Sequence, residues 1–179
     1  MNERATIRKA KPSDAPEIAR IHIGTWQVAY RGQLPDSLLD GLSAQLDRRI
    51  AFWERWLTVD GPTRGQTAIV AEVGGRVVGF VTFGDAEGEP RDLQVGEVYA
   101  IYLDPNYWNR GYGRDLFSAA VDGLRVHGYR EATLWVLESN ARTRRFYETA
   151  GWTPDGASKV DSLGDVALRE IRYRRMLTA

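Results

Sequence analysis

The chain contains no cysteine and only two histidines among its 179 residues. Without thiols it can form no disulfide bond, no thiolate metal site and no covalent intermediate on a cysteine nucleophile. His22 and His127 do not form an H-x-x-x-H motif, so we expect no metal site.

The chain also lacks an excess of charge and any long apolar run. Its 24 Lys and Arg residues balance 24 Asp and Glu residues, and no basic run exceeds a few residues. This balance argues against nucleic acid or an anionic membrane as a main partner. No apolar run reaches transmembrane length, and the N-terminal residues are polar. We expect a single cytoplasmic domain over residues 1–179, monomeric or homodimeric.

A P-loop motif, G-x-x-x-x-G-K-[ST], is absent as well, which argues against a nucleotide hydrolase of that class. The sequence has instead a shorter loop containing Gly111 and Gly113, between an apolar segment ending at Leu103 and an apolar-striped helix expected to reach Gly128. Backbone N–H groups at a helix start attract anions, and glycine lets a diphosphate approach them. We therefore predict an anionic ligand at this loop.

The same glycine pair could begin a dinucleotide-binding G-x-G-x-x-G motif. Leu116 occupies the third glycine position, but Glu138 ends the next predicted strand, about where a ribose-binding acid would lie. The loop follows a predicted antiparallel hairpin, residues 68–73 and 77–83 around Gly74-Gly75, which disfavours a parallel βαβ unit. A dinucleotide-binding oxidoreductase remains the less favoured alternative.

A second motif lies at residues 140–152, Asn-Ala-Arg-Thr-Arg-Arg-Phe-Tyr-Glu-Thr-Ala-Gly-Trp. Asn140 follows a predicted strand at 132–137 and suits a helix N-cap, and Gly151 suits a C-cap. Tyr147 lies two helical turns after Asn140, on the same face. Strand, glycine loop, helix, strand, Asn, helix, Tyr and Gly-Trp together resemble the second half of a bacterial GNAT N-acetyltransferase.

The N-terminal half agrees with this resemblance. Residues 6–10 are a predicted strand, Asp14 and Glu17 are spaced as a capping box, and residues 22–32 resemble the first helix and loop of bacterial GNAT proteins. Residues 166–177 alternate as a last, partly exposed strand. The resemblance implies an α/β (α+β) fold with a mixed, mostly antiparallel sheet of about six to seven strands and about four helices.

The resemblance implies an acyltransferase that moves an acetyl group from acetyl-CoA to a primary amine of a small molecule or peptide, directly in a ternary complex. The family motif Q/R-x-x-G-x-G/A falls on residues 108–113, with a tryptophan at its first position, which removes one polar contact. The implied cofactor-binding residues are Ile101, Tyr102, Leu103, Trp108, Asn109, Arg110, Gly111, Tyr112, Gly113, Arg114, Asn140 and Tyr147.

The resemblance also implies catalytic roles. Tyr147 would donate to the departing thiolate, although a phenol of pKa near 10 is slightly too weak an acid for a thiol near 8.5. Glu97 would take the proton of the amine, for which a carboxylate needs burial to raise its pKa. Glu138 or water are alternatives for this base.

The acceptor pocket is expected at Trp26, Tyr30 and Tyr99. Aromatic residues of this kind also fill cores, and the sequence leaves the acceptor amine open. A second alternative is a non-catalytic acyl-CoA sensor on the same fold, in which Glu97 and Tyr147 serve only as structure.

Overall fold

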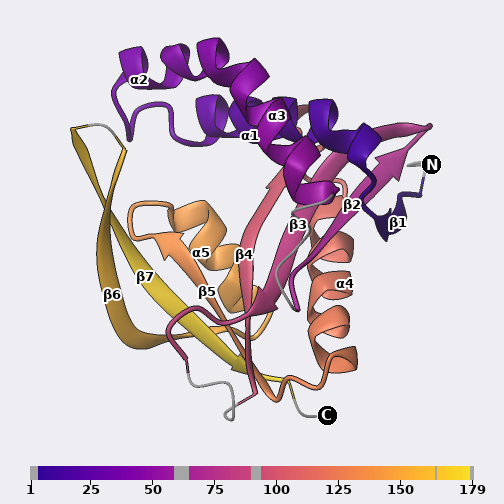
Figure 1. Ribbon diagram of the computed structural model, residues 1–179. Coiled ribbons are helices and arrows are strands. Elements are labelled where there is room, and N and C mark those ends of the chain that lie inside the picture. The colour runs from indigo at the N-terminus through magenta and orange to yellow at the C-terminus, as the bar shows by residue number, and fades with distance from the viewer. Residues whose placement is uncertain (1–3, 59–64, 90–93, 164, 178–179) are drawn as a thin grey trace.

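A computed structural model describes residues 4–58, 65–89, 94–163 and 165–177. Its centre is a seven-stranded sheet in the order β1-β2-β3-β4-β5-β7-β6 (Figure 1). Among the described strands only β4 and β5 pair in parallel. The strands are β1 (Thr6–Lys9), β2 (Thr67–Val73), β3 (Arg76–Asp85), β4 (Val95–Leu103), β5 (Glu131–Leu137), β6 (Thr153–Leu163) and β7 (Val166–Met176).

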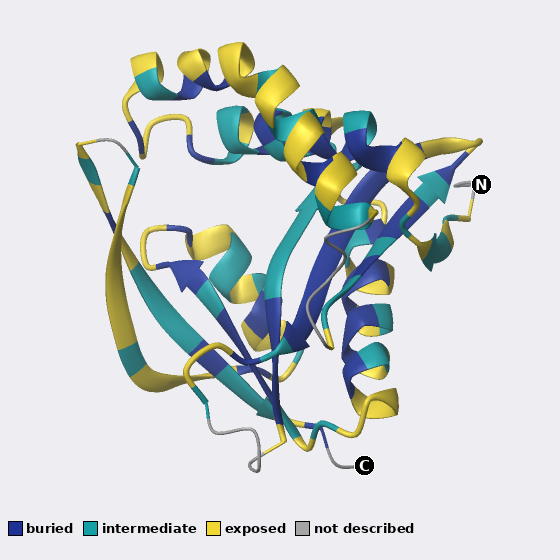
Figure 2. Ribbon diagram, in the orientation of Figure 1, coloured by how far each residue is buried: buried dark blue, intermediate teal, exposed yellow. Residues whose placement is uncertain are grey.

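Helices cover both faces of the sheet (Figures 1 and 2). On one face, Ile18 and Trp53 pack against Phe80 of β3. On the other, Leu116 and Tyr147 belong to the cluster that includes Val81. The predicted fold class is therefore confirmed. The helices are α1 (Ala15–Ala29), α2 (Asp36–Gly41), α3 (Leu46–Leu57), α4 (Tyr112–Val126) and α5 (Ala141–Thr149). No helix in the described ranges is long and apolar enough to span a membrane.

Local sequence signals account for most element boundaries. The β2–β3 hairpin turns at Gly74 and Gly75, whose φ values of 57° and 77° are those of a type I′ turn. The predicted capping box at Asp14 and Glu17 is wrong. The Asp14 carboxylate instead accepts a hydrogen bond from the Lys11 backbone N–H at 2.7 Å and pairs with Arg8 at 2.7 Å. This carboxylate thus ties the start of α1 to β1.

Strand β6 was not foreseen from the sequence. Almost all of its residues are exposed, so its sequence lacks the alternation of a half-buried strand (Figure 2). A register irregularity between Pro154 and Ser158 interrupts its pairing with β7. Its pairing with β7, the next strand along the chain, defines the strand.

The central feature of the sheet is that β4 and β5 separate part-way along their length. Val95–Val98 pair with Glu131–Leu134, and the ladder stops there. Beyond that point β4 continues to Leu103 alongside β3 only. A β-bulge accompanies the separation, because Val98 and Ala100 are paired with consecutive β3 residues and Tyr99 is left between them. We call the gap between residues 99–103 and 135–137 the β4–β5 opening.

Two helix glycines should respond oppositely to alanine. A Cβ on Gly123 of α4 would lie 2.6 Å from Cζ of Phe83, whereas a Cβ on Gly24 of α1 would meet no atom within 4 Å. Gly123→Ala should lower the free energy of unfolding by about 1–3 kcal/mol through overpacking. Gly24→Ala should raise it by roughly 0.5–1 kcal/mol. Urea unfolding measures both, and equal stabilisation would contradict the α4–β3 packing.

Candidate active site

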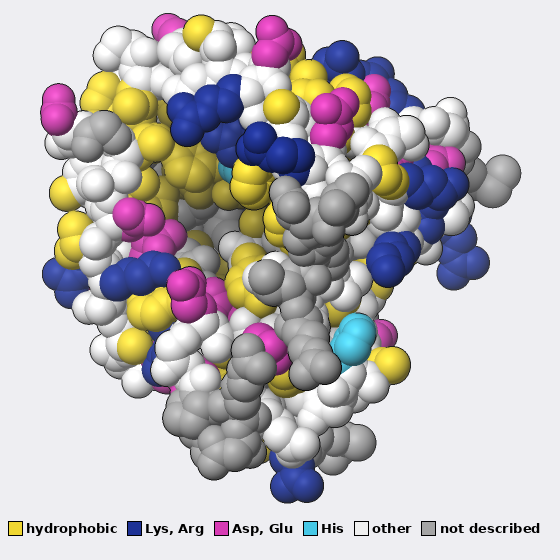
Figure 3. All heavy atoms as spheres, viewed as in Figure 1, with side chains coloured by type: hydrophobic (Ala, Val, Ile, Leu, Met, Phe, Trp, Pro, Cys, Tyr) yellow, Lys and Arg dark blue, Asp and Glu magenta, His cyan; other side chains and the backbone are white. Residues whose placement is uncertain are grey.

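A cavity of about 1110 Å³ occupies the β4–β5 opening. Its walls come from residues 98–103 and 135–137, the loop 109–114, and parts of α1, α5 and β7. Figure 3 shows a hollow between α1 and the β6–β7 hairpin, with hydrophobic side chains around it and Lys and Arg side chains above. Strands that separate in this way leave backbone groups without ladder partners, and the cavity is where they are exposed.

The glycine loop forms the anion-compatible end of the cavity. Gly111 is the N-cap of α4 with φ 91°, and Asn109 also has a positive φ of 62°. A Cβ on Gly113 would have its nearest neighbour, Cδ2 of Leu103, at 3.9 Å, so the space beside this backbone is open. First-turn N–H groups, the helix dipole and an uncrowded backbone together fit a pyrophosphate. Tyr112 differs from its neighbours, because its ring is buried in the core.

Trp108 occupies the position where the GNAT motif has Gln or Arg. Its Nε1 donates to the Leu103 carbonyl at 2.8 Å, and the Arg142 guanidinium lies 4.1 Å from its ring centroid. Arg142 also donates to the Asn109 side chain at 3.2 Å. The tryptophan therefore holds a cation from α5 beside the loop in place of the missing polar contact. Four arginines line this end: Arg110, Arg114, Arg142 and Arg145.

The tip of β4 is fixed by side chains where the strand has lost β5. The Leu103 carbonyl accepts from Thr25 at 3.1 Å as well as from Trp108. The Tyr102 hydroxyl accepts from Trp26 Nε1 at 2.9 Å, and its ring stacks on His22 at 4.6 Å. Helix α1 and the loop thus replace part of the missing ladder. Ile101, Tyr102 and Leu103 all line the cavity.

Tyr147 and Asn140 lie on the α5 wall of the cavity. The Asn140 side chain accepts from the Thr143 backbone N–H at 3.1 Å, which confirms the predicted N-cap. Tyr147 is buried against Phe117 and Phe146, and its hydroxyl has no hydrogen-bond partner among the described residues. Burial raises the pKa of Tyr147, so the phenol stays protonated at neutral pH.

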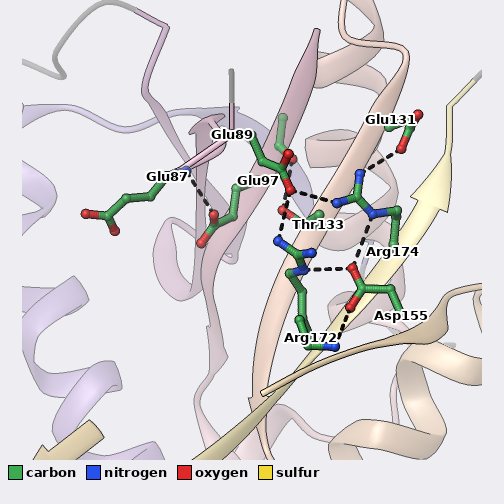
Figure 4. A network of polar contacts seen from close by, with 10 residues as sticks. Glu87, Glu89, Glu97, Glu131, Thr133, Asp155, Arg172 and Arg174 are labelled. Carbon is green, nitrogen blue, oxygen red and sulfur yellow. Dashed lines mark hydrogen bonds and ion pairs between the residues drawn. The ribbon is translucent and has the colours of Figure 1, made fainter. Parts of the chain in front are cut away.

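Glu97 does not share the cavity wall with Tyr147. Its side chain does not line the cavity, although its neighbours Val98 and Tyr99 do. Glu97 is only 7% exposed and accepts from the Glu87 backbone N–H at 3.2 Å. Burial raises the pKa of Glu97 to about 7, against the lowering effect of that hydrogen bond and of Lys159. Figure 4 shows it beside Thr133, next to the network of Arg172 and Arg174 with Glu89, Asp155 and Glu131.

The alternative base, Glu138, is exposed and pairs with Arg169 at 3.2 Å, outside the cavity lining. The three expected acceptor residues all line the cavity. Trp26 and Tyr30 meet edge to face at 4.9 Å, and the Tyr99 hydroxyl donates to the Asp85 carbonyl. The Tyr99 hydroxyl is therefore already engaged in a hydrogen bond within the protein.

Sequence reasoning missed the one carboxylate in the described cavity lining, Glu170 of β7. Its Oε2 lies 3.3 Å from Nζ of Lys159 on β6. No local motif surrounds it. Alternation along the last strand could place it on a face but could not show that this face borders the opening.

The open sheet and its arginine-lined cavity suit a large anionic ligand, and comparisons with known proteins identify the family. The model described as the Acetyltransferase (GNAT) family matches residues 26–152. A protein of Mycobacterium tuberculosis named as a probable N-acetyltransferase is 30% identical over 170 residues, covering 94% of this chain and 91% of that one. The chain belongs to the GNAT acetyltransferase family.

Solved structures agree with this assignment. The PaiA N-acetyltransferase of Thermoplasma acidophilum in complex with coenzyme A has a TM-score of 0.73 at 17% identity, covering 98% of this chain and 99% of that one. The yncA protein of Salmonella typhimurium, with its cofactor acetyl-CoA, has a TM-score of 0.70 at 23% identity, covering 98% and 95%. The protein is an acyltransferase, its cofactor is acetyl-CoA, and the dinucleotide-binding alternative is wrong.

Two titratable groups near the site, the half-buried His22 and the buried Glu97, should oppose each other in the pH dependence of stability. Burial and the nearby Arg49 lower the pKa of His22 from 6.5 to about 3, so the free energy of unfolding decreases as pH falls below 6.5. Burial raises the pKa of Glu97 from 4.5 to about 7, so for this group the free energy of unfolding decreases as pH rises above 4.5. Between these limits the two effects partly cancel.

Single variants should expose each effect. Relative to the wild type between pH 4.5 and 6.5, the free energy of unfolding should fall with rising pH in His22→Gln and rise with pH in Glu97→Gln. Each slope is bounded at about 1.4 kcal/mol per pH unit. Urea titrations at several pH values measure this. Slopes of the same sign in both variants would contradict the burial of one of the two groups.

Proposed function

We propose that this protein is a single-domain N-acetyltransferase that transfers the acetyl group of acetyl-CoA directly to a primary amine of a small molecule or peptide, in a ternary complex. One observation carries the proposal: a single cavity crosses the β4–β5 opening from an arginine-lined loop to an aromatic end that contains Glu170. Two reactants can enter from its two ends and meet beside β4.

Direct transfer is favoured because the cavity offers no activated nucleophile. The chain has no cysteine, and neither His22 nor His127 is among the described residues that line the cavity. A serine or threonine would need such a base beside it. The Thr25 hydroxyl is already committed to the Leu103 carbonyl.

Acetyl-CoA supplies an acyl group activated as a thioester. The backbone of residues 109–114, with Arg110 and Arg114, would hold its pyrophosphate, as the open backbone beside Gly113 permits. Residues 101–103 present backbone donors along the edge of β4 that has no strand partner. Such fixed donors stabilise charge that develops on a carbonyl oxygen.

Glu97 is the proposed base. A pKa of about 7 makes this carboxylate a better match for proton transfer near neutral pH than an ordinary one. Glu170 is less suited, because its charge is paired with Lys159. Since Glu97 is not among the residues that line the cavity, it would receive the proton from the ammonium through water.

Tyr147 is the proposed donor to the departing sulfur. Its hydroxyl has no partner among the described residues and is therefore available to the cavity. Burial raises its pKa further above that of a thiol, which makes complete proton transfer less favourable than in solution. Tyr147 thus keeps its proton and donates a hydrogen bond to the developing negative charge.

The proposal is tested by incubating the protein with acetyl-CoA and a panel of primary amines. Free thiol should appear above the hydrolysis background together with the N-acetylated amine, and the rate should rise with pH through about 7 as Glu97 ionises. Coenzyme A binding without amine-dependent thiol release would contradict this and favour the acyl-CoA sensor. Covalently acetylated protein as an intermediate would contradict direct transfer.

Tyr147→Phe should lower kcat and kcat/KM together, by roughly 10- to 100-fold, and leave affinity for coenzyme A nearly unchanged. The loss corresponds to a hydrogen bond to a charged group, worth about 1.5–3 kcal/mol. Tyr173→Phe is the matched control: its hydroxyl bonds Glu148 at 2.7 Å in the same aromatic cluster but outside the cavity lining. An equal loss in both variants would assign Tyr147 to packing alone.

A further inference from the structure

The charges in the described cavity lining are segregated. Four arginines lie on the loop and α5, whereas the only carboxylate, Glu170, comes from β7, in the same wall segment as Leu168. The arginine end suits the anionic cofactor. The opposite end therefore carries a charge that would repel that cofactor and attract a cation.

The surroundings of Glu170 also favour a cation. Leu168, two residues before Glu170 and on the same face of β7, packs in one cluster with Tyr30 and Trp26, and Tyr102 lines the same cavity as Glu170. Trp26 packs on Tyr30 and donates to the Tyr102 hydroxyl at 2.9 Å. A cation here would meet a carboxylate, phenolic oxygens and aromatic ring faces.

The side-chain ammonium of Lys159 already forms an ion pair with the Glu170 carboxylate. Nζ of Lys159 lies 3.3 Å from Glu170 Oε2 and 4.5 Å from the ring centroid of Trp135, which lines the cavity. The Lys159 side chain is 46% exposed and is not part of the described lining. A half-exposed lysine is weakly held and can turn outward when another cation takes its place.

Glu170 and Tyr147 lie on different parts of the cavity wall. Tyr147 packs with Phe117 in one core cluster, whereas Leu168, on the same face of β7 as Glu170, packs with Tyr30 in another. A cation held at Glu170 is therefore a different group from an amine that reacts beside Tyr147.

We propose, resting on the function proposed above, that the acceptor carries a second positively charged group and that Glu170 binds it in competition with Lys159. The acceptor class is then a compact amine with two separated cationic centres joined by an apolar segment. A single carboxylate matches one additional charge, so a densely polycationic acceptor is not expected.

The test is binding of two probes, pentane diamine (cadaverine) and pentylamine, to the full chain saturated with coenzyme A, measured by calorimetry. The wild type should prefer the diamine. Glu170→Gln should weaken diamine binding about tenfold, equivalent to ~1.4 kcal/mol, with little effect on the monoamine. Lys159→Gln should tighten diamine binding severalfold, because it removes the competing ammonium.

The opposite direction of the two variants is decisive. If the Lys159–Glu170 pair is only structural, removing either partner breaks the same ion pair, and diamine affinity moves in the same direction in both. Arg169→Gln, on the neighbouring β7 position and outside the described lining, controls for loss of one positive charge. Asp122→Asn on α4 likewise controls for loss of a carboxylate.

The remaining outcomes are equally distinct. Equal affinity of the wild type for the two amines, or unchanged diamine affinity in Glu170→Gln, overturns the inference. Should Glu170→Gln fail to fold, Lys159→Gln and Lys159→Arg decide alone, because only the former should tighten the diamine. Diamine binding that follows these expectations, with no thiol released from acetyl-CoA, would support the cation site while contradicting the transferase function.

Discussion

The early end of the β4–β5 ladder is the constraint on which the rest of this structure depends. A parallel pair that stops after Val98 and Leu134 leaves the free edge of β4 without partners, and a buried backbone must find others. At the tip, Thr25 and Trp108 bond the Leu103 carbonyl, so α1 and the loop before α4 are both tied to the strand. The interactions that repair the sheet also fix the two ends of the cavity relative to each other.

The electrostatics follow from the same geometry. Separation of the strands lets α5 present arginines to one end of the cavity and β7 present Glu170 to the other. The two glutamates near the cavity then differ by burial and pairing. Glu97 is buried, and among the described residues no lysine or arginine side chain is hydrogen-bonded to it. Its burial raises its pKa. Glu170, in contrast, forms an ion pair with Lys159. Two residues of the same type therefore acquire different acidities and charges from their surroundings alone.

Local signals allowed much of this to be predicted from sequence. The glycine loop, the Asn140 cap and the spacing to Tyr147 are short-range patterns whose geometry is set by the backbone, and the structure places all three at one cavity. The exposed strand β6 and the contacts that Arg142, Trp108 and Glu170 make were not predicted. Each depends on which strand or helix lies alongside, and a tertiary neighbour leaves no mark on local periodicity. The failed Asp14 cap has the same cause, because Arg8 on β1 is a stronger partner than a helix N–H.

Aromatic rings pack against Tyr102 and support this wall of the β4–β5 opening. The His22 ring stacks on the Tyr102 ring, and the ring centroid of Phe80, the β3 partner of Tyr102, lies 5.5 Å from that of Tyr102. Because burial and Arg49 keep His22 neutral near pH 7, its ring can pack like an apolar one while accepting a hydrogen bond from the guanidinium. A charged imidazole at this position would repel Arg49 and loosen the wall that carries Tyr102 and Trp26. The neutral state of one half-buried histidine thus supports the wall of the cavity formed by Tyr102 and Trp26.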